Sequence, residues 1–399
     1  MKLSREGTRP APLYWEVSTL ILLTLILVAG CTSASPQPVE VTATPSPTPL
    51  PPFGVAWTLQ TDSPIYGSPT IADGVAYFGS DDDNLYAADA QTGELLWRFE
   101  TGDRVRSRPA IANGRVYFAS DDNYLYAAST ETGQELWRFD IGSDVYRGTY
   151  DYLMSSPAVA NGVVYVGSGD SHLYAIDSQT GQEIWRFETG DYVRSSPAIT
   201  HGKVYFGGWD GYVYALDAGS GELVWRFYTG RAIQPSPTVA DGVVYIGSRM
   251  PFVYALDAAS GEEIWRFSYG TSWIESSATV YNGVVYVGSS DAFQLYAINA
   301  STAEEVWSFS TAAWAWSSPS VADGIVFIGS VYSFRDLPAD ERELYLFAVD
   351  TETGQELFRI PFNDTLDPVW MGIISSPTAV EGVVYFGSLD GRMYAVRVN

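Results

Sequence analysis

Two runs of acidic residues are the first place in this sequence where side chains gather densely enough to do chemistry. Asp81-Asp82-Asp83-Asn84 and Asp121-Asp122-Asn123 each bring several oxygen ligands together, as hard cations such as Ca²⁺ require. Both runs lack the Gly and the distal Glu of an EF-type calcium loop. Single residues hold the equivalent place later in the chain, at Asp170, Asp210, Asp291 and Asp390. This recurrence predicts that these side chains stabilise turns, with ion binding as the alternative.

Residues for nucleophilic or metal-assisted catalysis are scarce. The only two histidines, His172 and His201, each lack a second histidine nearby that would suggest a metal pair. The sequence has no Gly-x-x-x-x-Gly-Lys phosphate loop, no Gly-x-Ser-x-Gly elbow and no His-Glu-x-x-His motif. We therefore predict that the protein is not an enzyme, and that both histidines are surface variants.

The single cysteine, Cys31, follows a targeting segment. Lys2, Arg5 and Arg9 precede an apolar run from Val17 to Ala29, which is short for a membrane span and typical of a signal peptide. Its end, Val28-Ala29-Gly30-Cys31, resembles the lipobox of bacterial lipoproteins. The resemblance implies cleavage before Cys31 and lipidation at Cys31. An ordinary signal or anchor with an incidental cysteine is the alternative.

We expect three parts in the chain: a lipoprotein signal peptide over 1–30, a tether over 31–52, and one folded domain over 53–399. The tether is rich in Pro, Ser and Thr, a composition that stays extended and packs no core. Thr32 rather than Asp follows the cysteine, which by resemblance implies the outer membrane if the host has one. Otherwise we expect the outer surface of the plasma membrane.

The folded part consists of a repeat that positions the Asp and His side chains described above. An aromatic residue closes each of seven units at intervals of 40 to 51 residues, and most units open with Ser-Pro. Each unit contains four short runs rich in Val, Ile, Tyr, Phe and Trp, designated A to D, with Asp-Gly or Asn-Gly between A and B. Such dipeptides favour tight hairpins. A four-stranded repeat of about 40 residues is typical of a β-propeller blade.

The number of blades follows from the two ends of the domain. There are eight unit openings, but the last unit stops in run C at Met393-Tyr394, and a run D without a blade stands at Val55–Leu59. We therefore predict an all-β, eight-bladed propeller of four-stranded antiparallel blades. The N-terminal strand completes the C-terminal blade, which removes the open edges of the sheets.

The repeat Leu-Tyr-Ala-x-Asp-x-x-Thr-Gly-x-x-x-Trp, from Leu173 to Trp185, resembles the PQQ-like propeller repeat with its tryptophan docking motif. In that family the Trp packs between neighbouring blades. The resemblance implies this structural role for Trp57, Trp97, Trp137, Trp185, Trp225, Trp265, Trp307 and Phe358.

Quinoprotein dehydrogenases of the same fold hold pyrroloquinoline quinone (PQQ) and Ca²⁺ over the central channel. The alcohol dehydrogenases among them usually add an adjacent Cys-Cys disulfide and long insertions. This chain has one cysteine and is shorter, so we expect neither PQQ nor Ca²⁺ as a cofactor.

The net charge of −25 and the pI of about 4.2 exclude nucleic acid as a partner. They also disfavour electrostatic binding to anionic lipid, so membrane attachment is expected through the lipid anchor alone. We expect a monomeric propeller.

Three insertions interrupt the repeat, and all three lie in D–A or B–C connections. They span Gly142–Leu153, Val331–Glu343 and Pro361–Ile373. These connections emerge on one face of a propeller, where loop variation on a rigid frame creates binding sites. Aromatic and Arg residues, which are enriched in binding hot spots, gather in the D–A connections. The candidate residues on this face are Tyr66, Arg104, Arg106, Tyr146, Arg147, Tyr152, Arg194, Arg231, Trp273, Glu275, Trp314, Trp316 and Trp370.

Two functions compete. The first is a non-catalytic, membrane-tethered extracytoplasmic scaffold that binds proteins or peptides on this face. Among PQQ-like propellers it most resembles the lipoprotein subunit of the outer-membrane β-barrel assembly machinery, which implies a role in outer-membrane protein assembly. The alternative is a quinone or sugar binder, in which Arg and Trp stack on a planar ring.

Overall fold

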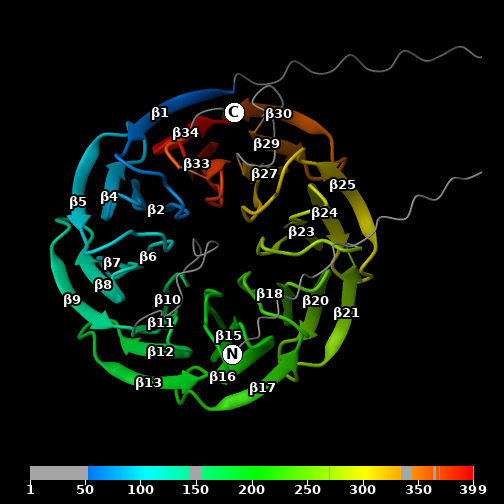
Figure 1. Cartoon of the computed structure of the whole chain (residues 1–399), viewed down its shortest axis with the longest axis horizontal. Coiled ribbons are helices and arrows are strands. Elements are labelled where there is room, and N and C mark those ends of the chain that lie inside the picture. Colours follow the sequence, from blue (N-terminus) through cyan, green and yellow to red (C-terminus); the bar gives the residue numbers. More distant parts are fainter. Residues whose placement is uncertain are drawn as a thin grey trace, which may run out of the picture. The chain divides into compact units, whose positions relative to one another are not determined.

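A computed structural model describes residues 53–142, 155–268, 270–333, 344–362, 365–367 and 369–398 of the chain. Eight four-stranded antiparallel sheets surround a central axis (Figure 1), so the predicted eight-bladed propeller is confirmed. Among the described residues, no helix is long and apolar enough to span a membrane.

The blades follow one another around the ring in chain order, with strand A innermost and strand D outermost (Figure 1). Blades 1 and 2 are β2 (Thr70–Ala72), β3 (Val75–Gly79), β4 (Asn84–Asp89), β5 (Leu95–Glu100), and β6 (Ala110–Ala112), β7 (Arg115–Ala119), β8 (Tyr124–Ser129), β9 (Glu135–Asp140). Blades 3 and 4 are β10 (Ala158–Ala160), β11 (Val163–Gly167), β12 (His172–Asp177), β13 (Glu183–Glu188), and β14 (Ala198–Thr200), β15 (Lys203–Gly207), β16 (Tyr212–Asp217), β17 (Leu223–Tyr228).

Blades 5 and 6 are β18 (Thr238–Ala240), β19 (Val243–Gly247), β20 (Phe252–Asp257), β21 (Glu263–Ser268), and β22 (Thr279–Tyr281), β23 (Val284–Gly288), β24 (Gln294–Asn299), β25 (Glu305–Ser310). Blade 7 is β26 (Ser320–Ala322), β27 (Ile325–Gly329), β29 (Tyr345–Asp350) and β30 (Glu356–Pro361). Blade 8 is β32 (Thr378–Val380), β33 (Val383–Gly387), β34 (Arg392–Arg397) and β1 (Gly54–Gln60). Two further strands, β28 (Val331–Ser333) and β31 (Trp370–Gly372), pair outside the blades.

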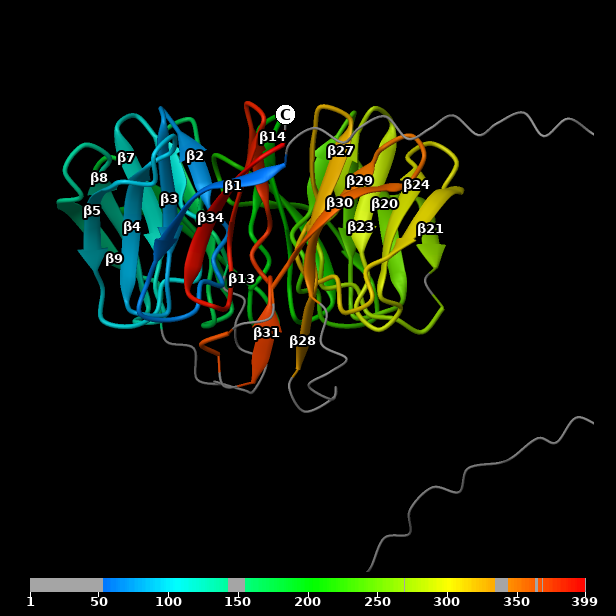
Figure 2. The same ribbon diagram turned by 90° about the horizontal axis from the view of Figure 1, so that it is seen from above.

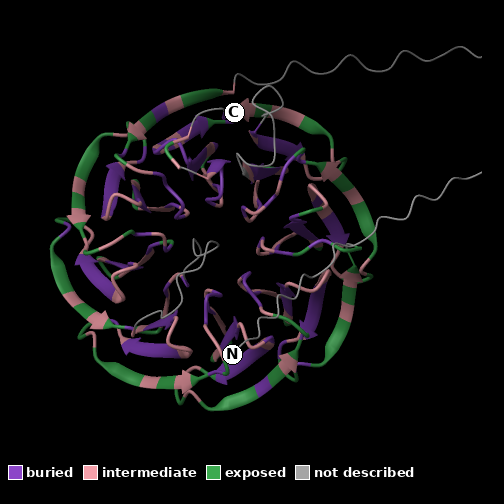
Figure 3. Cartoon of the chain, viewed as in Figure 1, coloured by how far each residue is buried: buried purple, intermediate pink, exposed green. Residues whose placement is uncertain are grey.

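Burial explains the composition of each run. Strands B and C are buried almost throughout because both faces of a blade pack against neighbouring blades. Strand D alternates exposed and half-buried residues on the rim, as the green and pink outer strands of Figure 3 show. Charged side chains on these outer edge strands protect the ring against pairing with other chains.

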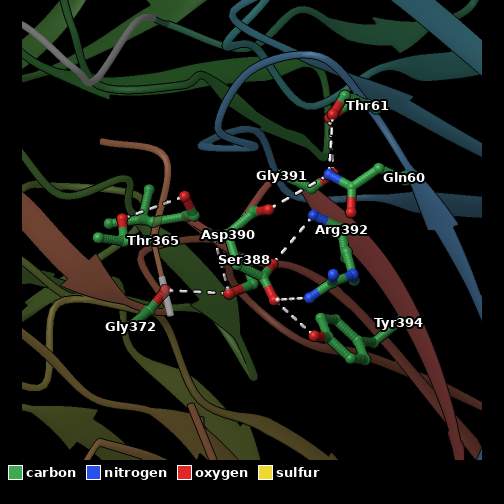
Figure 4. Close-up of polar contacts among 10 residues, drawn as sticks. Gln60, Thr61, Thr365, Gly372, Ser388, Asp390, Gly391, Arg392 and Tyr394 are labelled. Atoms are coloured by element: carbon green, nitrogen blue, oxygen red, sulfur yellow. Dashed lines mark hydrogen bonds and ion pairs between the residues drawn. The ribbon is translucent and has the colours of Figure 1, made fainter. Parts of the chain in front are cut away.

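Ring closure combines the two ends of the domain. β1 pairs with β34 in the register Trp57↔Ala395 and Leu59↔Met393, which confirms the predicted closure. Figure 4 shows the polar contacts at this junction. The Gln60 amide donates to the carbonyl of Gly391 at 3.0 Å, and the Thr61 N–H donates to the same carbonyl at 2.7 Å.

The aromatic residue of strand D holds each blade to the next one. In seven blades the indole Nε1–H donates to a backbone carbonyl of the following blade at 2.8–3.2 Å. The Trp57 ring also lies against Gly93 in the C–D turn of blade 1, where an added Cβ would stand 2.6 Å from Cδ2 of the indole. Phe358 has a different partner: it stacks on Phe53 with ring centroids 3.6 Å apart. No C–D turn joins β34 to β1, so blade 8 offers Phe358 no such turn.

Five Asp residues of the B–C loops hold turns as predicted, whereas Asp291 makes no such pair of hydrogen bonds with described residues and Asp81 binds Arg106 instead. Asp82 accepts hydrogen bonds from the Asn84 N–H at 3.2 Å and from the Tyr86 hydroxyl at 2.8 Å. The same arrangement, with a backbone N–H two residues on and a Tyr hydroxyl four residues on, recurs at Asp122, Asp170, Asp210 and Asp390. These carboxylates therefore fix the conformation of five B–C loops.

Candidate binding face

The D–A and B–C connections lie on one face of the ring, which we call the loop face. β28, from the B–C connection of blade 7, pairs with β31, from the next D–A connection, in the register Tyr332↔Met371. Figure 2 shows this two-stranded ribbon projecting beyond the blades. Two of the three insertions thus combine into one structure, and residues 143–154 of the third lie outside the described residues.

At the loop face, the residues that differ from blade to blade come together in pairs across blade boundaries. In three blades the D–A residue just before Ser-Ser or its equivalent bonds to the residue that follows the Gly-Ser at the end of strand B in the preceding blade: Arg106 with Asp81, Glu275 with Arg249, and Trp316 with Ser290. The corresponding residues at two further boundaries, Ile374 and Val331, and Tyr66 and Leu389, belong to one apolar cluster. The residues that carry the chemical differences between blades therefore also hold the blades together.

The first pair is a buried ion pair. Arg106 donates from Nε to Oδ1 of Asp81 at 2.8 Å and from Nη2 to Oδ2 at 2.5 Å, and both side chains are less than a tenth exposed. The guanidinium also lies 4.3 Å from the centroid of the Tyr66 ring. Burial raises the pKa of the nearby Asp121 carboxyl to about 6, although Arg106 opposes the shift. Arg106 is thus committed within the protein, and Arg104 is the exposed cation here.

Tyr66 connects this pair to the base of the ribbon. Its hydroxyl donates to the Asp367 carboxylate, which in turn accepts the N–H groups of Val369 and Trp370, each at 2.7 Å. Burial, together with the Asp367 charge, raises the pKa of the Tyr66 hydroxyl, so it remains a donor. β31 is therefore fixed to blade 1 as well as to blade 7.

Arginine and aromatic rings alternate across blades 4 and 5. The Trp209 ring lies between two guanidinium groups, those of Arg194 and Arg249, each 4.9 Å from its centroid. Arg249 reaches on toward Trp273 at 5.6 Å and donates to Glu275 at 3.3 Å. Burial raises the pKa of Glu275 to about 7, with Arg249 opposing. The row ends at the surface, where Trp273 is 44% exposed.

Buried polar atoms accompany this row. The Trp209 Nε1–H and the Gln234 Oε1 atom are buried and have no hydrogen-bond partner among the described residues. Most buried polar groups in proteins are paired, so these two are unusual. They place a donor and an acceptor on the loop face near the Arg and Trp side chains.

Three parallel rings form an aromatic stack at the base of the ribbon. Trp314 stacks on Trp316 with centroids 4.9 Å apart and on Tyr332 with centroids 4.8 Å apart, and Trp370 meets both indoles at 58°. The Trp316 Nε1–H donates to the Ser290 hydroxyl at 2.9 Å. The stack is half-buried, and it packs on an apolar cluster of Tyr66, Val331, Trp370, Ile374 and Leu389.

The predicted face residues divide by exposure. Three are exposed: Arg104, Arg231 and Trp273. Four residues are half-buried as a whole, namely Arg106, Glu275, Trp314 and Trp316, although the side chain of Arg106 is itself buried. Three are buried: Tyr66, Arg194 and Trp370. Tyr146, Arg147 and Tyr152 lie outside the described residues, as does Cys31.

Sequence reasoning missed Trp209, Arg249 and Tyr332 on the B–C side. The first two follow the Gly-Ser or Gly-Gly that ends strand B, where blades 1 and 2 have Asp81 and Asp121. A comparison of B–C loops by position would have found them.

Comparison with known families agrees with this architecture. The family model described as "Outer membrane protein assembly factor BamB" matches residues 54–147, 131–247 and 209–399. The chain belongs to this family. A search of curated protein sequences finds no significant match.

Solved structures similar to this BamB-family chain share its fold at low sequence identity. BamB from Moraxella catarrhalis has a TM-score of 0.66 and 18% identity, covering 86% of this chain and 97% of that one. The computationally designed Ika8 protein has a TM-score of 0.69 and 18% identity, covering 85% and 98%. Quinohemoprotein alcohol dehydrogenase ADHIIG from Pseudomonas putida HK5 has a TM-score of 0.66 and 19% identity, covering 87% and 76%. These similarities establish the fold alone.

Proposed function

We propose that this protein is a non-catalytic scaffold of the cell envelope, held by a lipid on Cys31, that binds a protein or peptide on its loop face. The observation that carries the proposal is the contrast between the two faces. Asp/Asn-Gly and similar tight turns recur on one face, whereas the loop face carries the ribbon and the exposed Arg104, Arg231 and Trp273. Exposed Arg and Trp on a rigid frame are typical of binding hot spots.

The family supports a role in outer-membrane protein assembly. We infer that the partner belongs to that process and that the extended 31–52 segment spaces the propeller from the membrane.

A redox role through PQQ and Ca²⁺ has less support from the residues present. Asp81 is occupied by Arg106, and Glu275 is paired with Arg249. No group of three His, Cys, Asp or Glu side chains within the described ranges is arranged to hold a metal. The stacked Trp314 and Trp316 rings cover each other rather than facing a common gap. The described residues do not fit this cofactor pair.

Quantitative capture tests the proposal. The affinity-tagged full chain is expressed in its host, extracted in detergent, and the co-purifying envelope proteins are measured by mass spectrometry. The face variant combines Arg231→Glu with Trp273→Ala; the matched control combines Glu131→Arg with Gln179→Ala in exposed C–D turns of the opposite face.

We expect the face variant to lose a partner at least about tenfold, as removal of two hot-spot side chains implies, and the control to retain it. Equal capture by both variants would contradict binding at this face. Cys31→Ser tests the anchor separately, with release from the membrane fraction as the expected result.

A further inference from the structure

A ring of serine residues surrounds the central axis at the start of the innermost strands. The second serine of each Ser-Ser-Pro opening, or its equivalent, accepts the backbone N–H of the corresponding residue one blade earlier. Seven such hydrogen bonds, of 2.8–3.0 Å, run from Arg108 through Ser156, Ser196, Ser236, Ser277, Ser318 and Ser376 to Ser68. We call the seven serines the serine ring; together with Arg108 they come from all eight blades.

Arg108 takes the place of the eighth serine. Because it has no hydroxyl group, the Ser68 N–H lacks the acceptor that the other blades provide. The Arg108 guanidinium instead donates from Nε to the Thr70 hydroxyl and from Nη2 to the Thr378 hydroxyl, both at 3.3 Å. A single side chain of blade 2 therefore spans blades 1 and 8, beside the blade that closes the ring.

Arg108 has no carboxylate partner among the described residues. Eight other arginines each have one, namely Arg104, Arg106, Arg138, Arg186, Arg249, Arg266, Arg359 and Arg392. It is reachable by solvent, yet enclosing protein lowers the pKa of its guanidinium. An exposed guanidinium without a carboxylate partner is available to pair with an oxyanion from solution.

The hydroxyl groups around Arg108 are also donors without acceptors. Each serine of the ring accepts a backbone N–H at Oγ, but within the described part of the chain none of the seven O–H groups donates to the protein. Arg108 has five N–H donors, of which two reach a described acceptor on another side chain, both at long range. The serine hydroxyl groups and the remaining N–H groups of Arg108 are therefore available as donors.

We propose that Arg108 and the serine ring form a binding site for a small oxyanion around the central axis. The guanidinium supplies a planar fork that pairs with two oxygen atoms of a phosphate, sulfate or carboxylate group. The neighbouring hydroxyl groups supply further donors. The bound anion neutralises Arg108 and links blades 8, 1 and 2. Arg108 and the serine ring belong to the D–A connections, but the anion site uses none of the exposed Arg104, Arg231 and Trp273 and does not depend on the proposed scaffold function.

The experiment uses the full chain in detergent. Isothermal titration calorimetry with inorganic phosphate, sulfate and acetate gives the Kd of each anion, at constant ionic strength with chloride as the reference anion. Thermal unfolding is followed under the same conditions. Arg108→Ser is the main variant because it restores the repeat's own residue and gives Ser68 its missing acceptor, so we expect it to fold. Arg231→Ser, which removes an exposed cation elsewhere, is the matched control.

We expect at least one oxyanion to bind the wild type and the Arg231→Ser control equally and to raise the Tm of both. Binding to Arg108→Ser should be at least about tenfold weaker, the loss expected for one charge-assisted pair. In the absence of oxyanion, Arg108→Ser should be at least as stable as the wild type. Absence of binding to the wild type would overturn the proposal, as would an unchanged Kd in Arg108→Ser. Comparison of the Kd of phosphate with the Kd of acetate distinguishes a preference for a tetrahedral anion from a preference for a planar one.

Discussion

Tight docking of each strand D aromatic against the next blade is best tested with two glycines that share a backbone conformation. Gly93 and Gly74 both have φ of +75°. At Gly93 an added Cβ would stand 2.6 Å from Cδ2 of Trp57, whereas at Gly74 no atom lies within 4 Å. Alanine at Gly74 therefore reports the backbone cost alone, and alanine at Gly93 adds the cost of displacing the indole.

The expected magnitudes follow from these two terms. A left-handed conformation costs an alanine about 1–2 kcal/mol, so Gly74→Ala should lower the free energy of unfolding by that amount. Overpacking adds about 1–3 kcal/mol, so Gly93→Ala should cost about 2–5 kcal/mol in total. Trp57→Ala should cost about 3–5 kcal/mol by itself, because a buried aromatic side chain is lost. In the Trp57→Ala background, Gly93→Ala should cost only its backbone term.

Equilibrium urea unfolding followed by far-UV circular dichroism measures the wild type and the four variants without relying on tryptophan fluorescence. The reasoning is refuted if Gly93→Ala and Gly74→Ala cost the same. It is also refuted if the cost of Gly93→Ala is unchanged once Trp57 is removed, because the two residues then do not interact.

Two further predictions concern buried charges of the loop face. Arg106→Ala should destabilise the protein by about 3–5 kcal/mol in urea unfolding because it leaves the buried Asp81 carboxylate unpaired. Arg138→Ala, which breaks an exposed pair with Glu135, should cost much less, and equal costs would show that the Arg106 pair is not desolvated. Because burial raises the pKa of Glu275 to about 7, the folded protein retains a proton that the unfolded chain releases above about pH 4.3. Stability should therefore fall as the pH rises between these values, and Glu275→Gln should flatten that part of a Tm-against-pH curve; an unaltered curve would contradict the assignment.

The architecture was predictable because the repeat is written into local chemistry. Asp73-Gly74 turns, buried B and C strands and a strand D at Val55–Leu59 without its blade each follow from short-range patterns, and together they predict eight blades and their closure. Phe358 was predictable as an aromatic contact. Its stacking on Phe53 was not, because that partner lies 305 positions away in the chain.

The candidate site was less predictable because its contacts cross blade boundaries. Nothing in the neighbourhood of Arg106 in the sequence indicates that Asp81 of another blade neutralises it. The ribbon likewise joins two insertions that show no alternating pattern of their own. The serine of each opening is visible in the sequence, but its bond to the neighbouring blade emerges only when the ring is closed.

Because β1 pairs with β34, the earliest strand of the ring finds its partner only after the last strand has been synthesised. The first strand to emerge keeps an unpaired edge, and Trp57 lacks its own blade, until residues 392–397 have been synthesised. Exposed edges of this kind make nascent chains prone to misassembly. Closure of the ring therefore waits until β34 has been synthesised, and a chain that stops short of β34 has a defect at its first strand as well as at its last blade.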